Sequence, residues 1–135
     1  MKYWLLLADP KSYSFDDLLK EKKALWDGIA GSLAQKNLRQ AAKGDTALIY
    51  HTAPDKAVAG TAKISSDPYP DPKAADGKRV VVDIEPLQRL RQVVPLAELR
   101  RNKQLEGMAF LRIQRIAVSA VTEGEFREIL RMSQE

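Results

Sequence analysis

The chain has 135 residues, of which 44% are hydrophobic, and it contains one histidine and no cysteine. This length suffices for one domain, residues 1–135, to bury a core without a metal or disulfides. The composition excludes disulfide frames, thiolate and multi-histidine metal sites and a cysteine nucleophile, so we expect neither a metal nor a cofactor. The 22 Lys and Arg residues outnumber the 18 Asp and Glu residues, which gives a formal net charge of +4.

The positive charge is concentrated in two segments. Residues 20–43 contain six basic and two acidic residues, and residues 87–115 contain seven basic and two acidic residues. The rest of the chain is therefore acidic. The two segments either fold into one patch for a polyanion or provide ordinary solvated surface.

The apolar start, residues 2–7, predicts a central strand because it is hydrophobic on both faces. It is too short for a signal sequence, and no later stretch approaches the roughly 20 apolar residues of a membrane span. We therefore expect a cytoplasmic protein with no membrane partner. Ser14 and Asp17 then form a capping-box pattern, which predicts the start of a short helix.

A second capping-box pattern, from Ser32 to Gln35, predicts a helix that runs to about residue 42. At about 100° per residue, this helix has an apolar face and an opposite basic face. The apolar face consists of Ala34, Leu38 and Ala41, and the basic face consists of Lys36, Arg39 and Lys43.

Four more strands are predicted downstream, at residues 46–51, 58–64, 79–85 and 113–118. Three prolines stiffen the loop at residues 66–72 and present Tyr69. Short helices are predicted at residues 95–99 and after Thr122, which forms a capping box with Glu125. These elements predict an α+β fold, a mixed β-barrel of about five strands with short helices covering its ends and rim.

Catalytic machinery is sparse in this sequence. It has no phosphate-binding glycine loop, nucleophile elbow or zinc-protease motif, and its single imidazole, His51, either contacts a ligand or hydrogen-bonds a turn. The strongest binding motif is Trp26-Asp27-Gly28, which has the parts to hold a planar ring or an anion at the mouth of the predicted helix. The alternative for Trp26 is packing in the core.

The order of several short motifs is specific although each motif alone is weak. The motifs are Trp4-Leu5, Ala8-Asp9-Pro10, Leu25-Trp26-Asp27-Gly28-Ile29, Asn37-Leu38-Arg39, Lys43-Gly44-Asp45, Tyr50-His51, Ala59-Gly60, Tyr69-Pro70-Asp71-Pro72, Val82-Asp83-Ile84, Pro95-Leu96-Ala97-Glu98-Leu99, and Leu111-Arg112 to Val118-Ser119. In this order the chain resembles the EVE domain, a PUA-like family, over nearly its whole length. The resemblance implies a single PUA-like barrel that binds DNA or RNA, without catalysis, through a pocket for a flipped and modified nucleobase.

The resemblance also implies roles for individual residues. The implied nucleobase-binding residues are Trp26 as a stacking wall, Asp9, Asp27 and Gly28 at the ring edge, His51 and Thr52 in the same opening, and Tyr69 as a lid. The implied phosphate-binding residues are Lys36, Arg39, Arg112 and Arg115.

The chain departs from the family pattern after Trp26-Asp27-Gly28-Ile29. The family typically continues Arg-Asn-Tyr-Gln-Ala-Arg-Asn, whereas residues 30–36 here read Ala-Gly-Ser-Leu-Ala-Gln-Lys. This change removes polar side chains from the pocket mouth and predicts a wider, differently selective or lost pocket. The alternative function is therefore a protein-interaction or small-molecule-sensing module on the same barrel; an enzyme acting on nucleosides, using Asp9, Asp27 and His51, ranks last.

Overall fold

The computed structural model describes residues 1–74, 77–113 and 115–134. Its strands are β1 (Tyr3–Ala8), β2 (Ala24–Trp26), β3 (Thr46–His51), β4 (Ala57–Ile64), β5 (Tyr69–Pro70), β6 (Val80–Pro95) and β7 (Val118–Val121). Its helices are α1 (Phe15–Glu21), α2 (Ser32–Arg39), α3 (Leu96–Arg101), α4 (Ala109–Arg112) and α5 (Glu123–Met132), with a 3₁₀ turn at Lys103–Leu105.

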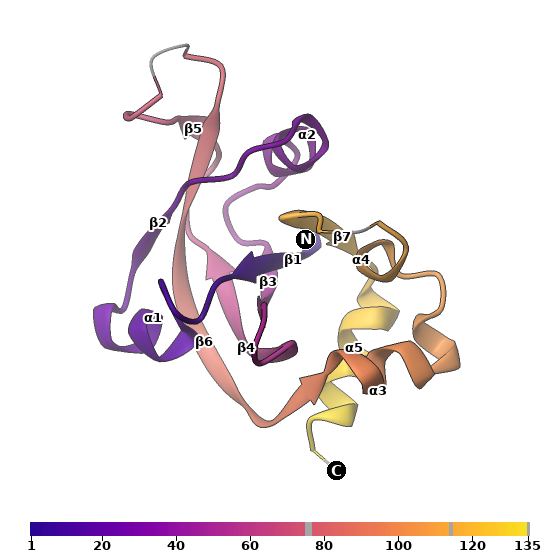
Figure 1. Ribbon diagram of the computed structural model, residues 1–135. Coiled ribbons are helices and arrows are strands. Elements are labelled where there is room, and N and C mark those ends of the chain that lie inside the picture. Colours follow the sequence, from indigo (N-terminus) through magenta and orange to yellow (C-terminus); the bar gives the residue numbers. More distant parts are fainter. Residues whose placement is uncertain (75–76, 114, 135) are drawn as a thin grey trace.

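The strands form one curled, mixed sheet in the order β2-β6-β4-β3-β1-β7, with β5 paired to β6 outside this path. Strand β1 pairs in parallel with β3, and the other pairs are antiparallel. The sheet curls into a half-barrel, and β1 lies within it between β3 and β7 (Figure 1). The α+β prediction is confirmed, although seven strands are described rather than about five, because β2 and β5 are too short to show a periodic pattern.

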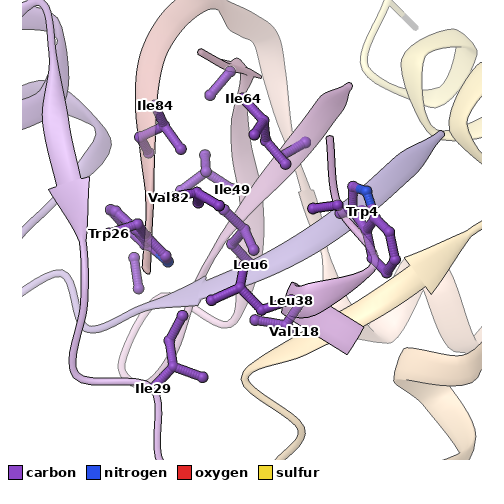
Figure 2. Close-up of a cluster of buried hydrophobic side chains, with 14 of the residues drawn as sticks. Trp4, Leu6, Trp26, Ile29, Leu38, Ile49, Ile64, Val82, Ile84 and Val118 are labelled. Atoms are coloured by element: carbon purple, nitrogen blue, oxygen red, sulfur yellow. The ribbon is translucent and has the colours of Figure 1, made fainter. Parts of the chain in front are cut away.

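Two hydrophobic clusters cover the two faces of the sheet. Trp4 and Leu6 of β1 belong to the cluster inside the half-barrel, shown in Figure 2, together with Trp26. Leu5 belongs to the other cluster, which α3 and α5 cover with Leu99 and Ile129. This alternation follows from the two-residue period of a strand. Strand β1 is paired on both sides and buried on both faces, as predicted.

Two of the three predicted capping boxes are confirmed. Ser14 caps α1 and Thr122 caps α5, each with reciprocal side-chain bonds. The third is wrong: Gly31 is the N-cap of α2 without a side-chain bond, and the helix ends at Arg39. The amide of Gln35 instead donates to the carbonyls of Ile29 and Val80, and Val80 lies too far along the chain for a local pattern to predict.

Strand β6 is much longer than the predicted strand 79–85, and the strand predicted at 113–118 is wrong. Helix α4 ends at Arg112, and β7 begins only at Val118. Arg115 has φ 56°, so the backbone leaves the extended region there and no strand can pass through it. Gln114, within the predicted strand, lies outside the described residues.

Candidate functional site

A cavity of about 980 Å³ lies beside strand β2, facing the end of β1. Residues 7–9 form one wall, and residues 23–29, which include all of β2, form another. Among the described strands, β2 pairs only with β6, so its other edge is available to the cavity. Three carboxylates line this space, those of Asp9, Glu21 and Asp27, against one cation, Lys23. We call it the acidic cavity.

Trp26 contributes to both the core and the acidic cavity. The residue is 9% exposed, and its side chain packs in the inner cluster with Leu6 and Ile29 (Figure 2). The ring of half-buried Tyr13 meets it edge to face, with 6.1 Å between centroids and 70° between planes. Trp26 is therefore a core residue that also lines the cavity, and Tyr13 adds a second aromatic ring to the wall.

Asp9 organises the turn that brings Tyr13 to the cavity. Its carboxylate accepts hydrogen bonds from the Lys11 amide and the Ser12 hydroxyl, at 3.0 and 3.2 Å. Its carbonyl accepts from the amides of Ser12 and Tyr13. Sequence reasoning missed Ser12 and Tyr13, although an aromatic residue directly before the Ser14 cap was the available signal.

The Tyr13 hydroxyl donates a hydrogen bond to the Glu21 carboxylate. Burial raises the pKa of Tyr13 well above its usual value, and the hydrogen bond to Glu21 raises it further. The phenol therefore stays protonated at neutral pH and holds Glu21 at the cavity wall. Glu21 was also missed by the sequence reasoning, because no local motif relates a residue at the end of α1 to Tyr13.

The opposite wall is the loop that follows β2. The Asp27 carboxylate is 34% exposed and forms an ion pair with the Lys73 ammonium at 3.4 Å. Gly28 has φ 74°, a conformation that favours glycine, and a side chain there would meet only open space. Gln35 fixes the neighbouring carbonyl of Ile29 at 2.9 Å. The loop is thus anchored to α2 while Asp27 and Gly28 remain open to the cavity.

A second cavity, of about 840 Å³, adjoins the first, because Leu7 lines both. Four exposed cations line it, and none of its described lining residues is acidic. We call it the basic cavity. Its cations are Lys56, Arg100, Arg112 and Arg115, and its other lining residues are Leu7, Tyr50, Thr52, Ala53, Leu96, Phe110 and Leu111.

The structure divides the predicted site between these cavities. Trp26, Asp9, Asp27 and Gly28 line the acidic cavity, whereas Thr52, Arg112 and Arg115 line the basic cavity. The predicted single opening shared by Asp9, His51 and Thr52 is therefore not what the structure shows. The reason is that Thr52 follows β3 on the side of the sheet that α3 and α4 cover.

His51 lies outside both cavities and makes two structural hydrogen bonds. Its Nε2 accepts from the Phe15 amide at 2.9 Å, and its Nδ1 lies 3.0 Å from the Asp55 carboxylate. These contacts fix the first residue of α1 and the turn after β3. The side chain is only 11% exposed, so the turn-bonding alternative describes His51.

Three other predicted residues also lie away from the described linings of both cavities. The Tyr69 hydroxyl donates to the Asp83 carboxylate at 2.7 Å, an interaction that ties β5 to β6 and raises the pKa of Tyr69 to about 12. Arg39 donates to the Lys78 carbonyl at 2.7 Å. Lys36 is exposed on α2. Tyr69 is therefore held against β6 by its hydrogen bond to Asp83 and is not a free lid.

No group of three His, Cys, Asp or Glu side chains suited to a metal ion occurs among the described residues. None of the helices in the described part of the chain is long and apolar enough to cross a bilayer.

Family comparison decides the identity of this fold. The family model described as the EVE domain matches residues 2–132. The chain belongs to the EVE domain family. Mouse thymocyte nuclear protein 1 is 28% identical to it over 98% of the chain and 74% of that protein.

Solved structures of EVE relatives superpose closely on the chain. A protein from Rhodopseudomonas palustris is 31% identical, with a TM-score of 0.94 over 99% of this chain and 94% of that one. Human THYN1 in complex with DNA containing 5-methylcytosine is 25% identical, with a TM-score of 0.88 over 100% of this chain and 99% of that one. An ASCH protein from Zymomonas mobilis shares the fold at 12% identity and a TM-score of 0.61.

Some EVE motifs of this chain are structural rather than part of a cavity. Asp45 of the Lys43-Gly44-Asp45 motif is buried, and its carboxylate accepts from the Trp4 indole and the amides of Lys2 and Ala42, each at 3.0 Å. Burial alone would raise the pKa of Asp45, but these hydrogen bonds outweigh it and lower the pKa. Asp45 therefore fastens the start of β1 to the turn before β3.

Proposed function

We propose that this EVE domain binds nucleic acid without catalysing a reaction, and that its acidic cavity receives one modified base turned out of its strand. The observation that supports this most directly is the composition of the cavity, two aromatic rings beside three carboxylates. Aromatic rings stack on bases, whereas carboxylates accept hydrogen bonds from exocyclic amino groups such as N4 of cytosine.

The charge of the acidic cavity favours a base over a phosphate as its occupant. Asp9 and Glu21 would repel a phosphate, Asp27 adds a charge that Lys73 partly offsets at 3.4 Å, and Lys23 already pairs with Asp83 at 3.8 Å. The related human THYN1 forms a complex with DNA containing 5-methylcytosine, which supports a methylated pyrimidine as the first ligand to test.

The departure from the family pattern at residues 30–36 lies outside the described lining of the acidic cavity. Ser32 and Leu33 are exposed at the start of α2. A change outside the described lining supports altered selectivity rather than loss of the pocket.

The proposal is tested by fluorescence titration with single-stranded oligonucleotides that contain one 5-methylcytosine or one cytosine in the same sequence. We expect the methylated strand to bind more tightly. Asp27→Asn should weaken that binding about tenfold, as expected for loss of a charged acceptor. Glu106→Gln is the matched control, because Glu106 is exposed and belongs to neither cavity lining.

Equal affinity for both strands, or an Asp27→Asn effect no larger than that of Glu106→Gln, would contradict the base-binding proposal. Failure of every oligonucleotide to bind would instead favour the protein-interaction or small-molecule alternative. Chemical conversion of the bound base would contradict the non-enzymatic assignment.

A further inference from the structure

The basic cavity concentrates positive charge that the fold itself leaves uncompensated. Its four cations, Lys56, Arg100, Arg112 and Arg115, come from the turn before β4, from α3, and from the end of α4 and the loop after it. Seven ion pairs occur among the described residues, and none of them includes any of these four side chains. Like charges gathered around one hollow repel each other, and an anionic ligand would relieve this repulsion.

The same cavity has an aromatic wall. Phe110 is half-buried, and its ring lies 4.6 Å from the ring of Tyr50, at 57° between planes. Rings next to cations form the combination that binds single-stranded nucleic acid, because bases stack on the ring while cations contact phosphates. A volume of about 840 Å³ also exceeds what a lone phosphate needs and suits a larger ligand.

Two of the four cations have an unfavourable backbone conformation. Lys56 has φ 49° and Arg115 has φ 56°; the only other described non-glycine residue with positive φ is Lys22. Glycine would adopt this conformation at lower cost. The fold therefore places two long cationic side chains on one cavity at positions where glycine would be less strained.

We propose that the basic cavity binds the nucleotide adjacent, in the same strand, to the base held in the acidic cavity. Its phosphates contact the four cations, and its base stacks on Phe110. Leu7 lines both cavities, which therefore lie close to each other near the end of β1, so neighbouring nucleotides of one strand can reach the two sites around that end of the sheet. This inference rests on the proposed function and adds a single-stranded flanking nucleotide as the ligand of a second site.

The test compares two probes, 5-methylcytidine alone and a single-stranded pentanucleotide with 5-methylcytosine at its centre. The double variant Arg100→Gln/Arg112→Gln should bind the pentanucleotide at least about tenfold more weakly and bind the nucleoside as the unmodified protein does. The double variant Arg91→Gln/Lys103→Gln is the control, because these exposed cations lie outside both cavity linings.

Arg115→Gly separates binding from folding. The substitution removes the cation and relieves the left-handed backbone at φ 56°, so the melting temperature should stay the same or rise while pentanucleotide affinity falls. Unchanged pentanucleotide affinity in both Arg100→Gln/Arg112→Gln and Arg115→Gly would overturn the proposal. So would equal losses in Arg100→Gln/Arg112→Gln and its control.

The outcomes distinguish this inference from the proposed function. If methylated and unmethylated pentanucleotides bind equally but the basic-cavity variants still lose affinity, the base pocket fails and the basic site stands as a nucleotide site. If methylation is recognised and the basic-cavity variants bind normally, the base pocket stands and the second site fails.

Discussion

The acidic and basic cavities share Leu7 and are similar in volume, yet their walls have opposite charge and different origins. The acidic cavity is built on a strand edge and on Trp26, which is also a core residue. The basic cavity is built from turns and short helices that project exposed Lys and Arg side chains. The fold thus presents a negatively charged cavity near a positively charged one.

Because of this difference in charge, we expect the two cavities to bind different parts of a nucleic acid. Carboxylates discriminate bases by accepting from amino groups, but they repel phosphates; cations attract every phosphate and carry little sequence information. A protein that must identify one base within a polyanion therefore benefits from keeping the two charges in adjacent but separate spaces.

The largest expected effect is on stability, and it tests whether a wall of the acidic cavity belongs to the hydrophobic core. Trp26→Ala should lower the free energy of unfolding by about 3–5 kcal/mol, because a large buried ring is removed. Phe110→Ala, in the basic cavity, should cost only about 1–2 kcal/mol, because its ring is partly exposed. Urea unfolding of both variants provides the measurement. Equal losses of stability would contradict the view that the acidic cavity is built on a core residue and the basic cavity is not.

The second prediction concerns how nucleic-acid binding depends on salt concentration. Each basic-cavity cation replaced by Gln should reduce the slope of log K against log salt for single-stranded binding by about 0.7, the value for one phosphate contact. Asp27→Asn in the acidic cavity should leave this slope unchanged. Titrations at several salt concentrations check this, and a change in slope for Asp27→Asn would show that phosphates reach the acidic cavity.

The third prediction concerns the backbone of the acidic-cavity loop. Gly28→Ala should destabilise the fold by about 1 kcal/mol, because alanine is strained at φ 74° although its methyl group meets no neighbour. Gly107→Ala, which also meets no atom and has no positive φ, should be close to neutral. Chemical denaturation distinguishes the two, and similar values would refute a conformational requirement at Gly28.

The smallest expected effect is a shift in the pKa of one tyrosine in each cavity, which reports the local charge. Burial raises the pKa of both Tyr13 and Tyr50, but Glu21 raises that of Tyr13 further, whereas Arg100 opposes the rise at Tyr50. Glu21→Gln should therefore lower the pKa of Tyr13, and Arg100→Gln should raise that of Tyr50 further. Ring NMR signals followed with pH would show these opposite movements; movement in the same direction would contradict the charge assignment.

The direction in which stability changes with pH follows from the same two pKa shifts. Both phenols keep their protons above the usual pKa of 10, so the folded state binds more protons than the unfolded state there. Their contribution to stability is complete below pH 10 and is lost as pH rises through the folded-state pKa values.

Local sequence patterns predicted those features whose cause is also local. The capping boxes at Ser14 and Thr122 require only residues three positions apart, and the two buried faces of β1 follow from its unbroken apolar run. The Ser32 pattern failed because Gln35 has distant partners across the fold, and nothing in residues 113–118 signals the left-handed backbone of Arg115.

The sequence by itself determined the family, the α+β class and the residue types available for binding, because these depend on motif order and short-range periodicity. Only the tertiary structure decided which residues share a cavity. The path of the sheet places Asp9 and Trp26 together, assigns Thr52 and Arg112 to a neighbouring space, and commits His51 to the Phe15 amide. Such groupings depend on strand pairing between distant segments, which local patterns do not specify.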